Sequence, residues 1–368
     1  MSLVPTDNRV YSAERPDAPL AGWQALPPEY AIPAHAPSLA EAQQYCSRLA
    51  HSHYENFSVV TWFLPKHLHQ HFYNVYAYCR ISDDLGDEVG NPQQALALLD
   101  AWEAELNATY LSLVEPPLRD VRKTLKELER EGPEGSGAKG LGSATAPRHP
   151  VFIALRETIR ELDIPRAPFA NLLTAFRQDQ TVTRYPTFDD LLGYCLNSAN
   201  PVGHLVLYVC GYRDAERQQL SDYTCTALQL ANFWQDVAVD YAGKGRIYLP
   251  LESLEKFGVS EDDIAQRRPT PQFRELMKFE VARAREWFQR GLPLAAKVDK
   301  HLAIDIELFS RGGLEILNAI ERQGYDVLTR RPAISKPRKL WLVGRAALGK
   351  LTRGKSEFTT EALRTRSK

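Results

Sequence analysis

Features typical of secreted and membrane proteins are scarce in this chain of 368 residues. Its five cysteines form no Cys-x-x-Cys pair, which argues against a zinc site or a disulfide framework and predicts reduced, buried thiols. No apolar run approaches the ~20 residues that a membrane-spanning helix needs. The N-terminus lacks the basic and then apolar layout of a signal peptide. We therefore expect a cytoplasmic protein, at most peripheral on the inner face of the membrane.

Strand patterns are also almost absent, and no Gly-rich dinucleotide fingerprint follows a strand. Apolar residues instead recur at helical spacing, which predicts an all-α protein. Ser38 with Glu41 has the pattern of a capping box and is expected to start the first helix. Helices are expected at residues 38–54, 66–88, 93–110, 151–163, 168–182, 188–194, 204–211, 215–241, 260–265, 271–298 and 301–323.

Composition divides the chain into three parts. Residues 1–37 are rich in Pro and Ala without sustained periodicity, so we expect a flexible leader. Residues 38–330 form one expected domain, interrupted by a Gly-, Pro- and Ser-rich stretch at 131–150 that we expect to be a mobile loop. Residues 331–368 form a basic tail.

The tail is strongly charged: residues 330–368 hold twelve basic and two acidic residues, about +10 net, whereas the whole chain has a net charge of −1. Two interpretations stay open. The tail forms an amphipathic helix on anionic lipid, or it is a solubilising segment without fixed structure. No nucleic-acid-reading motif accompanies these charges, so nucleic acid is not an expected partner.

One stretch places polar side chains at helical spacing among apolar residues. Gln229, Asn232, Asp236 and Asp240 are spaced i, i+3, i+7 and i+11, so they share one face of a helix and are called here the second acidic file. Carboxylates removed from water cost several kcal/mol unless a partner compensates them. A surface helix could also point this face at solvent, so the stretch alone leaves both possibilities open.

A similar pattern occurs earlier in the chain. Tyr76, Arg80, Asp83 and Asp87 are spaced i, i+4, i+7 and i+11, and they form the first acidic file. If the two files face one another across a cavity, hard divalent cations can neutralise them, and Mg²⁺ prefers carboxylate, phosphate and water oxygens. Arg80 and Gln229 would then donate to a phosphate-type ligand. The pair of files predicts a metal–diphosphate site between two helices.

The same residues carry a family resemblance over roughly residues 40–330. The motifs are Arg80-x-x-Asp83-Asp84-x-x-Asp87, Asn232-x-x-x-Asp236-x-x-x-Asp240 and Arg246-Ile-Tyr248-Leu-Pro250. In this order and separation they resemble the squalene/phytoene synthase family. The resemblance implies a single-domain class I isoprenoid synthase fold, with helices around a central cavity. It also implies head-to-head condensation of prenyl diphosphates with Mg²⁺ bound between the two acidic helices.

Further details resemble the branch of the family that makes hydroxysqualene in bacterial squalene and hopanoid biosynthesis. They are the phrase 54–58 followed by Phe63-Leu-Pro65, the phrase 194–203 in place of the Val-Ala-Gly that related synthases usually show, and the segment 312–331. This branch implies conversion of presqualene diphosphate to hydroxysqualene, with water capturing the cation and no need for NADPH. Other enzymes of squalene synthesis are then candidate partners.

The resemblance implies roles for individual residues. Mg²⁺ would be held by Asp83, Asp87, Asn232, Asp236 and Asp240. The diphosphate would be bound by Arg80, Gln229, Arg246 and Tyr248, with His53 as a further candidate. The lining of the cavity would come from Phe57, Tyr76, Tyr208 and Phe233. Because this chain has polar residues where related synthases usually show Val-Ala-Gly, we hypothesise that Asn200, or its neighbours Asn197 and Ser198, holds the water that captures the cation.

Other interpretations stay open. Asp84 and Glu88 are expected off the ligand-facing side of their helix, with solvated or supporting roles as plausible as metal contact. Tryptophans such as Trp102 and Trp234 are expected in the core. A presqualene diphosphate, squalene or phytoene synthase starting from two prenyl diphosphates is the nearest alternative function. A non-catalytic assembly factor with the same fold is more remote, because that role predicts damaged acidic motifs and both are intact here.

Overall fold

The computed structural model describes residues 26–52, 64–113 and 146–334. Within these ranges the expectation of an all-α fold is confirmed, because no strand is present and the only β-type pairing is an isolated bridge between Arg184 and Ile247. The α-helices are α1 (Leu39–Ser52), α3 (His69–Asp87), α4 (Pro92–Leu113), α6 (Pro150–Leu162), α7 (Ala167–Gln178), α8 (Phe188–Ser198), α9 (Asn200–Val209), α10 (Ala215–Lys244), α11 (Leu251–Phe257), α12 (Glu261–Ala265), α13 (Pro271–Gly291) and α14 (Lys300–Arg322). Short 3₁₀ turns are η2 (Pro28–Tyr30), η3 (Lys66–Leu68) and η4 (Leu292–Ala296).

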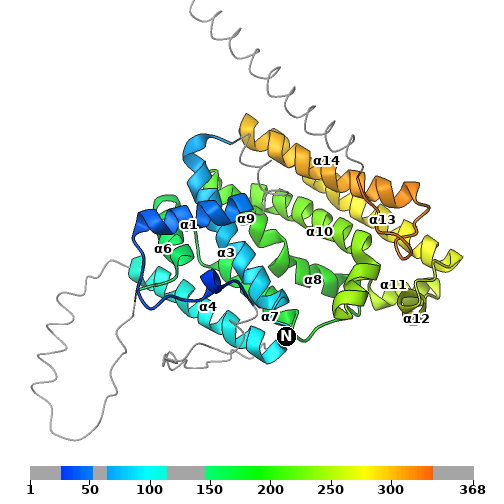
Figure 1. Cartoon of the computed structure of the whole chain (residues 1–368). Helices are drawn as coiled ribbons and strands as arrows, with labels where there is room; N and C mark the ends of the chain where they lie inside the picture. The colour runs from blue at the N-terminus through cyan, green and yellow to red at the C-terminus, as the bar shows by residue number, and fades with distance from the viewer. Residues whose placement is uncertain (1–25, 53–63, 114–145, 335–368) are drawn as a thin grey trace, which may run out of the picture.

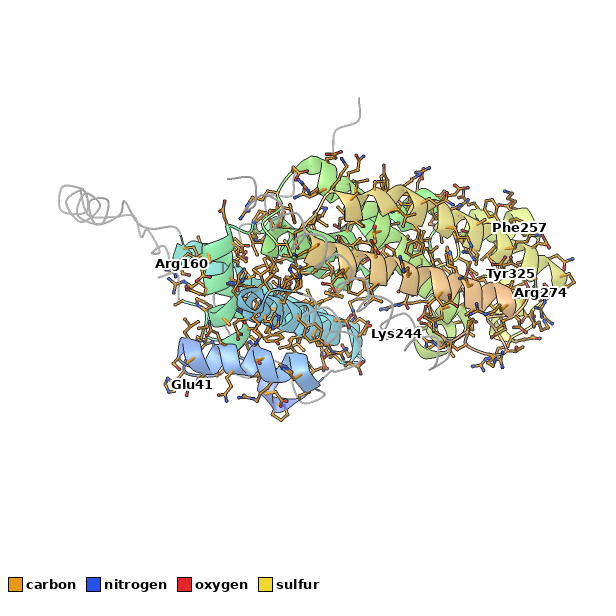
Figure 2. The ribbon with its side chains drawn as sticks, turned by 90° about the horizontal axis from the view of Figure 1, so that it is seen from above. Glu41, Arg160, Lys244, Phe257, Arg274 and Tyr325 are labelled. Carbon is orange, nitrogen blue, oxygen red and sulfur yellow. The ribbon has the colours of Figure 1, made fainter. Side chains whose placement is uncertain are left out.

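The helices pack around two large buried cores (Figure 1). The first core lies among α1, α3, α4, α6 and α7 and includes Tyr78 and Trp102. The second lies among α8, α10, α11, α13 and α14 and includes Trp234 and Phe273. Helices α7, α8 and α9 pack on one another and join the two halves. Figure 2 shows the N-terminal helices with Glu41 and Arg160 on one side, and the far end of the other half with Phe257, Arg274 and Tyr325.

Local signals place the helix starts. Ser38 and Glu41 form the expected reciprocal cap of α1: the Ser38 amide donates to Glu41 Oε2 at 2.9 Å and the Glu41 amide to Ser38 Oγ at 3.4 Å. Thr187 and Asp190 form an equivalent capping box at α8. Such caps satisfy backbone N–H groups that have no partner inside the helix.

Some boundaries differ from expectation, and α9 begins at Asn200 rather than near residue 204. Helix α7 ends at Gln178 rather than near residue 182. The helix expected at 271–298 ends at Gly291 and continues as η4, where Pro293 has no N–H to extend an α-helical ladder. Helix α11 lies between Pro250 and the left-handed Gly258 (φ 65°). It was not expected, because its seven residues are too few for a clear period.

The expected interruption near Pro201 is present. Helix α8 ends at Ser198, Ala199 has φ −112° and ψ −50°, and α9 begins with Asn200 and Pro201. Gly203 then lets α9 approach α10 closely, since a Cβ there would lie 2.2 Å from Ser221 Oγ and 2.6 Å from Cys225 Sγ. After this break, α9 packs beside α10.

The described chain starts inside the segment expected to be a leader. Leu26 and Tyr30 are buried there, and the Tyr30 hydroxyl donates to Asp84 Oδ2 at 2.8 Å. Most of the stretch 131–150 and the tail from residue 335 lie outside the described residues. Among the described helices, none combines the length and apolar character that crossing a membrane requires.

Candidate active site

A cavity of about 570 Å³ lies between α3 and α10. It brings together both acidic files and the motif that follows α10. The expected site residues that line it are Tyr76, Arg80, Asp83, Asp87, Gln229, Asn232, Phe233, Asp236, Asp240, Arg246 and Tyr248. The spacing argument therefore identified side chains that share one space although more than 140 positions separate the two files.

Some expected site residues lie elsewhere. Asn200 is buried but is not among the lining residues, and its Oδ1 accepts a hydrogen bond from Thr226 Oγ1 at 3.0 Å. Tyr208 packs against the first core and accepts a hydrogen bond from Gln218 Nε2 at 3.1 Å. His53 and Phe57 lie outside the described residues.

Basic side chains neutralise Asp87 in the first acidic file. Lys244 Nζ lies 2.5 Å from Asp87 Oδ2, and Arg246 Nη1 lies 3.4 Å from Asp87 Oδ1. Arg246 is itself held by the backbone oxygen of Asp179, to which its Nη2 donates at 2.8 Å. These contacts tie the end of α10 to the end of α3.

Asp84 has a supporting position beside the cavity. It is buried, accepts the Tyr30 hydroxyl, and accepts a hydrogen bond from Arg80 Nε on Oδ2 at 2.9 Å. A second contact joins Arg80 Nη2 to Asp84 Oδ1. Of the roles left open for Asp84, the structure therefore favours orientation of Arg80, whereas Glu88 is exposed and does not line the cavity.

In the second acidic file, Asp236 is paired with a residue far along the chain. Arg331, beyond the end of α14, contacts Asp236 with both Nε and Nη2, the latter at 2.9 Å from Oδ2. Its neighbour Pro332 accepts a hydrogen bond from Gln235 Nε2 at 2.6 Å. The segment after α14 is thereby fastened to the cavity side of α10.

The other two aspartates have perturbed acidities. Burial raises the pKa of Asp83 to about 7, and the nearby Asp87 carboxylate adds to the shift. Burial likewise raises the pKa of Asp240 to about 7, with further contributions from Asp236 and from Asp87. Because Asp87 on α3 affects Asp240 on α10, the two files act on each other across the cavity.

Aromatic rings form one wall of the cavity. The Phe233 and Tyr248 rings stack with centroids 3.8 Å apart and planes 8° apart. Tyr194 packs on this pair and donates from its hydroxyl to Asp179 Oδ2 at 2.9 Å. Burial raises the pKa of Asp179 to about 6. Stacked aromatic faces without nucleophiles can stabilise a cation by cation–π interaction.

Sequence reasoning gave no role to three residues that the structure brings to the site. Lys244 follows Asp240 by four positions, so extending the second file by one turn would have found it. Asp179 stands alone in the turn after α7, and Arg331 lies outside any helix, so helical spacing gives no signal for either. Ser198, already named as a neighbour of Asn200, lines the cavity, and its buried Oγ has no hydrogen-bond partner among the described residues.

The carboxylates fit a divalent metal in donor chemistry. Among the described residues, no three His, Cys, Asp or Glu side chains are grouped closely enough to hold one ion. Mg²⁺ does not need such a cage, because it is commonly bound by one or two carboxylates together with substrate phosphates and water. Asp83 and Asp240 are partly buried carboxylates whose pKa values are raised chiefly by burial that nearby positive charge does not offset, as expected where a cation binds.

The two tryptophans assigned to the core are buried there. Trp102 Nε1 donates to Ser82 Oγ at 2.9 Å, and Trp234 Nε1 donates to the backbone oxygen of Glu280 at 3.2 Å. Neither lines the cavity.

Fold and site together define a class: an all-α protein with two facing files of carboxylates at a partly aromatic cavity. The model of the squalene/phytoene synthase family matches residues 50–338, and the chain belongs to this family.

Related proteins agree with that assignment. A 15-cis-phytoene synthase of Synechococcus elongatus is 28% identical over 82% of this chain and 91% of its own length. Phytoene synthase 3 of Zea mays is 26% identical over 98% of this chain and 78% of its own.

Among solved structures, squalene synthase HpnC of Alicyclobacillus acidocaldarius is 42% identical, with a TM-score of 0.66 over 83% of this chain and 99% of its own. A ligand-bound dehydrosqualene synthase, 24% identical with a TM-score of 0.66 over 85% of this chain and 98% of its own, shares the fold.

Proposed function

We propose that this protein is a hydroxysqualene synthase, which ionises presqualene diphosphate and captures the resulting cation with water. The observation that carries the proposal is the cavity itself, in which two carboxylate files with basic side chains adjoin a stacked aromatic wall. The polar groups suit a metal-bound diphosphate. The aromatic wall suits a hydrocarbon cation.

In this proposal the first step is departure of diphosphate. Mg²⁺, when bound by the two files, would neutralise the developing negative charge of the leaving group. Arg80, Gln229 and Arg246 would donate to diphosphate oxygens, and Tyr248 would supply a hydroxyl at the same end. Asp84 would keep Arg80 oriented through its paired contact.

The second step is capture of the carbocation by water, in which a C–O bond forms and the proton lost by the water passes to the released diphosphate. Phe233, Tyr248 and Tyr194 present aromatic rings and stabilise positive charge without forming a bond. Ser198 replaces Asn200 as the proposed holder of water, because Ser198 lines the cavity and Asn200 is bonded to Thr226.

Two facts about relatives bear on the product. The 42% identity with a protein described as a squalene synthase, HpnC, favours a squalene-type product. Several relatives at 25–29% identity are phytoene synthases, so condensation of two prenyl diphosphates to presqualene diphosphate, squalene or phytoene is the alternative. An assembly-factor role has no support from a site whose carboxylates are intact.

A product assay tests the proposal. Purified protein with Mg²⁺ receives presqualene diphosphate or farnesyl diphosphate, each with and without NADPH, and products are identified by mass spectrometry. Hydroxysqualene from presqualene diphosphate, at a rate indifferent to NADPH, is the expected result. Consumption of farnesyl diphosphate would instead support the condensing alternative, and no turnover of either substrate would overturn the assignment.

We also propose that the basic tail brings the enzyme to anionic lipid, since its substrate carries a C30 hydrocarbon chain and its product is insoluble in water. The support is its charge of about +10 over residues 330–368. Co-sedimentation with vesicles containing phosphatidylserine should fall when residues 338–368 are deleted. Equal sedimentation of the deleted and complete chains would contradict this.

A further inference from the structure

Two basic side chains contact Asp87, one of the expected metal ligands. Lys244 lies 2.5 Å from its Oδ2 and Arg246 lies 3.4 Å from its Oδ1, so both oxygens are engaged. A divalent cation bound at Asp87 would lie close to these two basic groups and would repel their positive charge. Binding of a cation at Asp87 therefore favours withdrawal of one of them.

Lys244 is the group that can withdraw. The Arg246 side chain is 10% exposed and also donates to the backbone oxygen of Asp179 at 2.8 Å, so it is fixed at two points. The Lys244 side chain is 37% exposed, and Asp87 is its only ion-pair partner among the described residues. A lysine ammonium on a flexible stem also changes direction more easily than a planar guanidinium.

The freed ammonium would remain at the cavity. Lys244 is the last residue of α10, one turn beyond Asp240, and the left-handed Gly245 (φ 63°) ends the helix there. It lines the same cavity as Asp83 and Asp240. In Figure 2 Lys244 lies where the N-terminal helices meet the rest of the molecule, as its contact with Asp87 requires. Its three donors suit a phosphate oxygen.

We propose that Lys244 is an exchanging cation of the site: it neutralises Asp87 while the site is empty of metal and binds the diphosphate once Mg²⁺ has taken its place. The inference rests on the proposed function, because it takes the ligand to be a diphosphate. It adds a binding residue that lies outside the family motifs on which the site was predicted.

Calorimetric binding of Mg²⁺ alone, and of inorganic diphosphate in the presence of Mg²⁺, tests the exchange. In Lys244→Met, diphosphate binding with Mg²⁺ should weaken about tenfold, as expected for loss of a charged hydrogen bond. Binding of Mg²⁺ alone should tighten, because its competitor at Asp87 is gone. Lys244→Arg should recover most of the diphosphate affinity.

Lys278→Met is the matched control. Lys278 is an exposed lysine on α13 with a carboxylate neighbour, Glu275, at 3.8 Å, and it does not line the cavity. This variant should bind both ligands as the unaltered protein does.

Three results would overturn the inference. They are unchanged diphosphate affinity in Lys244→Met, a parallel weakening of both ligands as a purely structural role predicts, and failure of Lys244→Arg to recover binding. If the unaltered protein bound no diphosphate with Mg²⁺, the proposed function would fail as well, so the two failures are distinguishable.

Discussion

The four aspartates of the acidic files are not equivalent. Asp87 and Asp236 are each held by basic side chains, Lys244 with Arg246 in one case and Arg331 in the other. Asp83 and Asp240 have pKa values raised to about 7, which means that nearby positive charge does not fully compensate their burial. A divalent cation would therefore gain most from contact with Asp83 and Asp240, whereas at Asp87 it would compete with Lys244.

The first prediction concerns Asp83. In Asp83→Asn the uncompensated carboxylate is gone, so the metal-free protein should be at least as stable at pH 8, while Mg²⁺ should no longer raise its melting temperature as far. Turnover should fall about a hundredfold or more, as for loss of a group that stabilises the transition state. Thermal unfolding with and without Mg²⁺, beside the product assay, measures both effects.

Glu88→Gln serves as the control because Glu88 follows the same helix but is exposed. It should leave both the melting temperature and turnover unchanged. A Mg²⁺ response in Asp83→Asn equal to that of the unaltered protein would remove Asp83 from the metal site.

The second prediction separates Ser198 from Asn200. Ser198→Ala should lower the share of hydroxysqualene among products from presqualene diphosphate, because the cavity loses its proposed water-holding hydroxyl. Asn200→Ala should leave the product ratio unchanged and lower stability by about 1–2 kcal/mol, because Thr226 loses a buried acceptor. Product ratios by mass spectrometry and urea unfolding distinguish the two, and a product shift seen only in Asn200→Ala would reverse the assignment.

At the scale of elements, α10 connects the site to the core. One face carries the second acidic file, and the rest packs against α8, α9, α13 and α14. Its length of 30 residues and the cap by Asp214, which accepts the Arg217 amide at 3.0 Å, keep the file in a fixed direction. Helix α9 packs closely against one side of α10 at Gly203.

The third prediction concerns that approach. Gly203→Ala places a Cβ within 2.2 Å of Ser221 Oγ, so the protein should lose about 1–3 kcal/mol of unfolding free energy. Gly193→Ala is the matched control on the preceding helix α8, where an added Cβ meets no atom within 4 Å. It should be neutral or stabilising by about 0.5–1 kcal/mol, because alanine favours helix. Equal stability of the two variants would show that α9 and α10 can separate without loss.

At the scale of the whole molecule, the two cores are joined by packing of α7, α8 and α9 and by ion pairs across the cavity. Because the carboxylates face one another between the halves, their ionisation affects the stability of the complete fold. Without metal, repulsion between the files opposes their approach.

The fourth prediction is a pH dependence. Asp83 and Asp240 have an ordinary pKa of 3.8 and a folded pKa of about 7, so the folded protein binds more protons between these values. Their contribution to unfolding free energy should therefore fall as pH rises from about 4 to about 7. Mg²⁺ requires the ionised carboxylates, so stabilisation by Mg²⁺ should grow across the same window.

Unfolding midpoints with and without Mg²⁺, measured from about pH 5 to about pH 8, give this difference directly. In the double variant Asp83→Asn, Asp240→Asn, the difference in midpoint with and without Mg²⁺ should no longer change with pH. A Mg²⁺ effect independent of pH in the unaltered protein would contradict the prediction.

The sequence by itself determined the fold class and both acidic files. Each file lies within one helix, so helical periodicity alone brings its members onto one face, and the break at Pro201 and the cap at Ser38 are similarly local. The short helix α11 was not predicted from the sequence, because seven residues give too weak a helical period.

Tertiary structure alone decided which partners the site residues have. Arg331 contacts Asp236, which lies 95 positions earlier in the chain. Asp179 lines the cavity from a turn, whereas Asn200 hydrogen-bonds to Thr226 and does not line the cavity. These contacts depend on how helices pack, and packing is set by the whole core. Local periodicity orders side chains along one helix and carries no information about what a distant segment places opposite them.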